Sequence, residues 1–368
     1  MNTAKITPPH HDSGKGTKRL DYIDFAKAFG MLLIVWGHIR LSGWSNAFVY
    51  AFHIPLFFFL SGMVFSRKRY PTFKSFLLKR VNSLIKPYIV FSLLTWIVWA
   101  SFSYATHANV DSYWMPLAET FIAQGSGGFL VHNVPLWFVT CLFVVEIVYY
   151  FIADLKRIWI MTVTVAMAAI SYLAISNLKC FDVTLLPWNM EVAMLALPFY
   201  AAGHWMVQSK SHQGIMDVVN GHKGLAMVLA VLLAYVVYVG SQYNGSISFG
   251  HANLGKNVFV AYGCGLAGTL MWITECILLS DTKMNKANVK LLEWIKWFGR
   301  NSFNAMAIHN PIKGFVCVIV GGVLHCGSAA VSGNSCYSFV AFLLTLAVTV
   351  AGMVFIERFK VKFSKEKK

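Results

Sequence analysis

The stretch "KAFGMLLIVWGH" (Lys27–His38) carries a lysine and a histidine at the two ends of ten uncharged, mostly apolar residues. A run this apolar belongs in lipid or in a protein core, where an unpaired ammonium group is costly. Eleven residues make close to three turns of an α-helix, so Lys27 and His38 project from one face, about 16 Å apart along the axis. That rise is about half the hydrocarbon thickness of a bilayer. The stretch therefore predicts a helix with a cation near one membrane surface and an imidazole deep in the bilayer.

The composition of the whole chain is that of a membrane protein. Its 368 residues are 57% hydrophobic and only 12% charged, with a mean hydropathy of +0.59. Soluble domains carry about 25% charged residues, which argues against a soluble fold. No cleavable signal peptide is visible, because a polar tail precedes the first apolar run and no small-residue cleavage site follows it. Apolar runs near 20 residues predict ten membrane-spanning helices, at roughly 22–42, 46–65, 87–106, 134–153, 157–176, 189–207, 223–240, 257–279, 302–323 and 336–356.

The 31 Lys and Arg residues alternate along this predicted topology. Both tails and the even-numbered loops hold most of them, whereas the odd-numbered loops hold only Arg40, Lys179 and Lys256. Under the positive-inside rule, both termini are cytoplasmic and the number of spans is even. The net charge of +16 is thus mainly a topology signal and does not indicate nucleic acid, although binding of anionic lipid or a phosphorylated cofactor at that face stays open. We predict an all-α integral membrane protein with a cytoplasmic tail at 1–20, a membrane domain at 21–357 and a basic cytoplasmic tail at 358–368.

Ionisable groups inside the predicted spans are the candidate functional residues, because each is costly in lipid unless it is paired or used. Asp24 lies on the same face of the first span as His38, and His53 in the descending second span should lie at a height comparable to His38. Two alternatives stay open: Lys27 and Asp24 could snorkel to the inner interface, and a lone histidine could be a packing residue. The seven cysteines show no CxxC pair and no zinc spacing, so we expect no metal site. The remaining ionisable groups in spans are Glu146, Glu191, His204, Glu275, His309 and Lys313.

Two motifs resemble a known family. The first, "RLDYIDFAKAFGMLLIVWGHI" (19–39), resembles the first span of the membrane-bound acyltransferase 3 family, in which an Arg or Lys is followed after ten residues by His. The second, "FHIPLFFFLSGMVF" (52–65), resembles the second span of its fucose 4-O-acetylase-like, inner-membrane O-acetyltransferase branch. Three further stretches resemble the family more weakly: "FLLKRVNSLIKPY", "PLWFVTCLFVVE" and "FGRNSFNAMAIHN". The chain departs from the family's Arg-x-x-Arg pattern, because Ser83 stands where the second arginine is expected and only Lys86 offers a nearby charge.

The resemblance implies a multi-pass enzyme of the bacterial inner membrane. Such an enzyme moves an acyl group, usually acetyl from acetyl-CoA, to a sugar hydroxyl of a surface polysaccharide or its polyprenyl-linked precursor. His38 would act as general base or as a transient acyl carrier, with Asp24 pairing with Lys27 and His53 orienting the acceptor or the catalytic group. The residues expected to meet the phosphorylated donor are Lys27, Arg80, Lys86 and His309.

Two other classes of protein compete with this interpretation. A transporter or flippase for a lipid-linked saccharide would also show ten spans and intramembrane charges. The sequence shows no inverted repeat, and transport offers no reason for the two motifs. A membrane subunit without activity explains the buried charges least well.

Overall fold

The computed structural model describes residues 20–40, 43–126, 128–177, 186–208, 210–280 and 286–366, so the predicted N-terminal tail lies almost entirely outside the described residues. Within these ranges the chain is helical and has no strand, only an isolated bridge between Ser248 and Asn253. The α-helices are α1 Asp21–Ile39, α2 Trp44–Tyr50, α3 His53–Met63, α4 Phe73–Arg80, α5 Lys86–Ala105, α6 Met115–Ile122, α7 Trp137–Ile152, α8 Arg157–Asn177, α9 Met190–Gln208, α10 Lys210–Gly221, α11 Lys223–Asn244, α12 Val258–Ser280, α13 Lys286–Arg300, α14 Ser302–Val323, α15 Ser328–Gly333 and α16 Ser335–Glu366. The short helices are η1 Arg67–Arg69, η2 Val81–Ile85, η3 Val134–Leu136, η4 Pro187–Asn189 and η5 Phe249–His251.

Nine helical stretches within the described residues are long and apolar enough to cross a membrane. They coincide with nine of the ten predicted spans, so the chain is an all-α multi-pass membrane protein. The tenth prediction, 189–207, is a helix of 19 residues, α9, but it is not among the nine. Its Glu191, Pro198 and His204 lower its hydropathy, and neighbouring helices bury most of its side chains.

Two predicted spans differ from the structure in their continuity. The second span is broken at Ala51 and Phe52, so that His53 begins α3. Pro55, which lacks an N–H, is tolerated there because the first turn of a helix leaves its N–H groups without intrahelical partners. The third span is longer than predicted, because α4, the π-helical turn η2 and α5 run on from one another. The last helix also continues beyond the predicted boundary at 357, into the basic tail.

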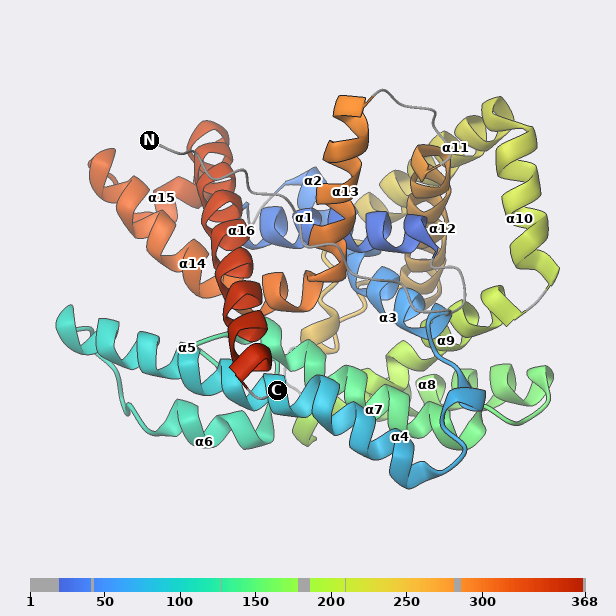
Figure 1. The fold of residues 1–368 in the computed structure, drawn as a ribbon, viewed down its shortest axis with the longest axis horizontal. Coiled ribbons are helices and arrows are strands. Elements are labelled where there is room, and N and C mark those ends of the chain that lie inside the picture. The colour runs from blue at the N-terminus through green and yellow to red at the C-terminus, as the bar shows by residue number, and fades with distance from the viewer. Residues whose placement is uncertain are drawn as a thin grey trace.

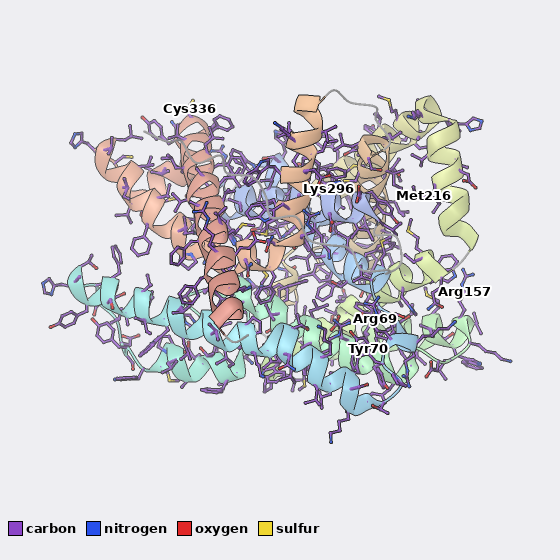
Figure 2. The ribbon with its side chains drawn as sticks, in the orientation of Figure 1. Arg69, Tyr70, Arg157, Met216, Lys296 and Cys336 are labelled. Atoms are coloured by element: carbon purple, nitrogen blue, oxygen red, sulfur yellow. The ribbon has the colours of Figure 1, made fainter. Side chains whose placement is uncertain are left out.

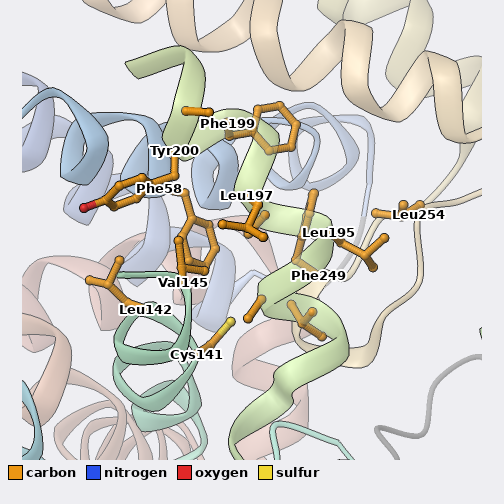
Figure 3. Packing of buried hydrophobic residues seen from close by; sticks show 14 of the residues in the cluster. Phe58, Cys141, Leu142, Val145, Leu195, Leu197, Phe199, Tyr200, Phe249 and Leu254 are labelled. Atoms are coloured by element: carbon orange, nitrogen blue, oxygen red, sulfur yellow. The ribbon is translucent and has the colours of Figure 1, made fainter. Parts of the chain in front are cut away.

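The core is built around α9. Figure 3 shows α9 with Phe58 of α3 and Leu142 and Val145 of α7 on one side, and with Phe249 and Leu254 on the other. The helices α3 and α9 cross so closely that a Cβ atom added to Gly62 would lie 2.0 Å from the Tyr200 carbonyl oxygen. A Cβ atom at Gly203 would likewise lie 2.0 Å from the Phe59 carbonyl oxygen. Glycine at both positions therefore permits the backbone contact that joins the two helices.

Helix α1 lies near the middle of the molecule and packs against α3, α12, α13, α14 and α16 (Figure 1). The amphipathic helix α13 crosses it, and a Cβ atom at Gly299 would lie 1.9 Å from the Asp24 carbonyl oxygen. Lys296, labelled on α13 in Figure 2, forms an ion pair with Asp21 at 3.0 Å. The Trp297 indole donates a hydrogen bond to Glu357 of α16 at 2.6 Å. Helix α13 therefore packs against the end of α1 that is predicted to face the cytoplasm.

The segment between α6 and α7, which the sequence predicts to lie outside the cytoplasm, folds back onto the helices. Asn189, the last residue of η4, connects this segment with η5. Its side-chain oxygen accepts a hydrogen bond from the Gly125 N–H at 3.0 Å, and its amide donates to the Gly250 carbonyl of η5 at 3.3 Å. Both of these glycines pack against the Trp137 ring. Asn133 donates to the Ala307 carbonyl of α14 at 2.7 Å. These contacts hold the segment between α6 and α7 against α7 and α14.

Candidate active site

A cavity of about 180 Å³ lies between α1, α3, α7, η2 and α14. Helix α1 contributes Lys27, Met31, Ile34 and His38, which follow one another at steps of four, three and four residues and so form one helix face. The shared face that the sequence predicts is therefore present, with the lysine and the histidine at its two ends. The other lining residues are His53, Ile54, Phe57, Ser61, Leu84, Pro135, Trp137, Phe138, Val139, Leu142, Ser302, Phe303 and Met306.

His38 is half-buried at the end of this face. Its ring makes no hydrogen bond within the described residues, and its ring centroid lies 5.3 Å from that of His309, with 47° between the two ring planes. His38 and His53 both line the cavity, so the structure brings together the two histidines that the sequence places at similar height. An imidazole in this position has nitrogen atoms available for a substrate hydroxyl.

The tautomer of neutral His53 follows from its backbone contact. The Nδ1 atom of His53 lies 2.9 Å from the Val49 carbonyl oxygen, and a carbonyl only accepts, so Nδ1 carries the proton and donates. The Nε2 atom of the neutral ring then holds the lone pair. The ring of Tyr50 packs edge-on against His53 at 4.8 Å, and its hydroxyl lies 3.5 Å from the Gly37 carbonyl of α1. Tyr50 thereby connects the break between α2 and α3 with the end of α1 that carries His38.

Lys27 lines the opposite end of the cavity. Near this end, the Arg80 guanidinium forms an ion pair with Glu146 of α7 at 2.8 Å, and Glu146 is almost fully buried. The guanidinium also lies over the rings of Phe76 and Tyr70, with its carbon 5.3 and 5.8 Å from the two centroids. Arg80 is therefore a partly buried cation, balanced by Glu146, that lies beside the cavity and does not line it. Glu146, one of the ionisable groups in the predicted spans, thus has a cation as its partner.

The remaining predicted residues lie farther from the cavity. Lys86, the first residue of α5, is exposed and does not line it, because the π-helical turn places Leu84 there instead. Asp24 is buried, and its carboxylate lies 4.0 Å from the Arg300 guanidinium of α13. Fourteen residues of helix separate Asp24 from His38, a rise of about 21 Å, so the two side chains do not touch.

His309 lies beside His38 and not beside Lys27, where a role in binding donor phosphates would place it. The His309 side chain is fully buried, and Nδ1 lies 3.1 Å from the Ala305 carbonyl and 2.9 Å from the Met306 carbonyl. Lys313 follows four residues later on the same face of α14. Glu275, another ionisable group in a predicted span, is exposed.

Three polar residues at the cavity are absent from the sequence prediction: Ser61, Trp137 and Ser302. The sequence could have indicated Ser61, because His53, Phe57 and Ser61 follow one another at steps of four residues and so share one face of α3. No sequence pattern indicated Trp137 or Ser302, because their positions depend on how η3 and α13 join the helices that follow them.

One known protein family matches the chain. The model of one protein family, described as an acyltransferase domain, matches residues 20–356. No curated protein and no solved structure matches the chain. The family match covers nearly the whole chain, including every element that lines the cavity, so the chain belongs to the acyltransferase 3 family.

Proposed function

We propose that this membrane acyltransferase is an O-acetyltransferase of the bacterial inner membrane. It moves an acetyl group from acetyl-CoA to a sugar hydroxyl of a surface polysaccharide or of its polyprenyl-linked precursor. The observation that carries the proposal is the single cavity that has Lys27 at one end and His38 at the other. A cation at one end suits the phosphates of coenzyme A, and a base at the other suits a thioester and a hydroxyl.

The donor would lie along the face of α1. An extended pantetheine arm has a length of the same order as the rise of about 16 Å from Lys27 to His38. The wall between these ends is mostly apolar, with the hydroxyls of Ser61 and Ser302 available to the amides of the arm. Arg80, whose charge is balanced by Glu146, lies near the Lys27 end and could meet the donor only if it exchanged that partner for a phosphate. Lys86 would reach only a part of the donor that extends out of the cavity.

The transfer itself requires a base, because a sugar hydroxyl is a poor nucleophile. In a direct route, His38 takes the hydroxyl proton while the sugar oxygen attacks the thioester carbonyl. The tetrahedral intermediate then collapses with cleavage of the C–S bond, and the imidazolium returns the proton to the thiolate of coenzyme A. In the alternative route, a His38 nitrogen attacks first and carries the acetyl group to the sugar. His53, with its Nε2 lone pair, would orient the acceptor hydroxyl in either route.

The experiment that tests the function compares surface glycans from cells with the wild-type gene, without the gene, and with His38→Ala. We expect one acetyl ester, labile to mild alkali, to be present only with the wild-type gene, while the variant still accumulates in the membrane. Full esterification by His38→Ala would contradict the mechanism. An unchanged glycan together with accumulated lipid-linked precursor inside the cell would favour the flippase instead.

A further inference from the structure

The tautomer of His309 is set by the backbone of α14. Its Nδ1 atom lies within hydrogen-bond distance of two carbonyl oxygens, those of Ala305 and Met306. Carbonyl oxygens only accept, so Nδ1 must carry the proton and donate. In the neutral ring, Nε2 is then an acceptor.

This acceptor has no partner within the part of the chain that the structure describes. The Nε2 atom of His309 is shielded from solvent, and no donor lies within hydrogen-bond distance of it. A buried nitrogen lone pair without a hydrogen bond is costly, and such atoms are rare in folded proteins. An orphaned acceptor next to a reacting group is therefore evidence that a donor reaches it in another state of the protein.

The neighbouring ring is that of His38, with 5.3 Å between the two centroids. Hydrogen bonds between catalytic groups are often long without substrate and tighten when the substrate is bound. The charged and titratable groups that face His38 are His53 of α3 and His309 and Lys313 of α14. Lys313 opposes a positive charge on His38, so an imidazolium at that position needs an acceptor to stabilise it.

We propose that His309 is the positioning residue for His38. When substrate is bound, the N–H of His38 donates to Nε2 of His309, which leaves the other nitrogen of His38 turned towards the cavity as the base. The proton of the sugar hydroxyl passes to that cavity-facing nitrogen and then to the leaving thiolate. The N–H shared with His309 stays on His38, and His309 keeps its own proton on Nδ1. This role rests on the proposed acetyltransferase function and replaces the predicted contact with the donor.

The test uses His309→Leu and His309→Gln in membranes that contain the endogenous acceptor, with acetyl-CoA labelled in the acetyl group. Leucine removes the acceptor atom, whereas glutamine retains one in its side-chain oxygen. We expect His309→Leu to lower the maximal rate of ester formation by about 100-fold or more, with the KM for acetyl-CoA within about two-fold of wild type. We expect His309→Gln to recover at least about one tenth of the wild-type rate.

The controls separate folding, binding and function. Cys317→Ala, another buried change in α14, should leave the rate unchanged, and acetyl-CoA binding to each purified variant reports whether the fold is intact. A wild-type rate in His309→Leu, an equal loss in both variants, or a raised KM at an unchanged maximal rate would each overturn the positioning role. If His38→Ala abolishes transfer while His309→Leu does not, the proposed function stands and this inference fails. If wild-type membranes form no ester, both fail.

Discussion

At the scale of one side chain, the buried residue His132 makes the stability of the fold depend on pH. It lies between α6 and α7, is 3% exposed, and neither ring nitrogen has a partner within the described residues. Burial lowers the pKa of His132 to about 4. The same side chain in an unfolded chain titrates near 6.5. The unfolded state therefore binds more protons between these two values, and stability falls as the pH falls through that window.

We predict that lowering the pH from 7 to 5 removes about 2 kcal/mol of stability through His132. His132→Leu, which removes both the titration and the orphaned nitrogens, should lose less stability over this range. Thermal unfolding in detergent at the two pH values measures the difference. His107→Asn, a change at an exposed residue with positive φ, is the control. An equal loss of stability in wild type and His132→Leu would show that His132 is not protonated on unfolding.

Lys27 carries the second prediction at the residue scale. If its ammonium binds a donor phosphate, Lys27→Ala should weaken acetyl-CoA binding by about 10-fold or more, because a charge-assisted hydrogen bond contributes about 1.5–3 kcal/mol. Lys27→Arg should weaken binding less, since it keeps the cation. Equilibrium dialysis with labelled acetyl-CoA measures both variants. Equal affinity in wild type and Lys27→Ala would exclude Lys27 from the donor site.

At the scale of elements, the crossing of α3 and α9 decides how the cavity is walled. It places His53, Phe57 and Ser61 against the space beside α1, and it depends on the backbone contacts at Gly62 and Gly203. An added methyl group at either glycine would meet backbone atoms, which cannot move as the end of a side chain can. The helices would have to separate.

We predict that Gly62→Ala or Gly203→Ala destabilises the protein by about 1–3 kcal/mol or more, the range for overpacking. The melting temperature in detergent should fall, and activity should fall with it because the wall of the cavity moves. Gly263→Ala in α12 is the matched control, since nothing lies within 4 Å of the added Cβ atom. That control should be neutral or gain up to about 1 kcal/mol from helix propensity. Unchanged melting in Gly62→Ala would mean that the two helices do not touch there.

At the scale of the whole molecule, the topology depends on whether α9 crosses the membrane. Nine described stretches are long and apolar enough to span, and α9 would make ten. With ten crossings, the exposed His222 between α10 and α11 faces the cytoplasm, as the distribution of basic residues predicts. Without α9, His222 and Asp111 would face the same side.

We predict opposite sidedness for these two positions. His222→Cys and Asp111→Cys, each introduced after Cys180, Cys326 and Cys336 have been changed to serine, are treated with a membrane-impermeant maleimide. The cysteine at 111 should be labelled in right-side-out vesicles and the one at 222 in inverted vesicles. Labelling of both in the same vesicles would show that α9 does not cross.

Much of the architecture follows from local properties of the sequence. The length of each apolar run determined the spans, because a helix must cover about 30 Å of hydrocarbon. The helical period determined that Lys27 and His38 share a face, because side chains eleven residues apart on one helix align whatever surrounds them. Only the tertiary structure decided the partners across helices: the ring of His309 beside His38, the ion pair of Glu146 with Arg80, and the hydrogen bond from the segment between α6 and α7 to α14. These contacts join residues up to 271 positions apart (His38 to His309), and they depend on close crossings and on breaks such as that at Phe52. No local periodicity encodes such contacts, because they arise from the shapes of whole helices packed together.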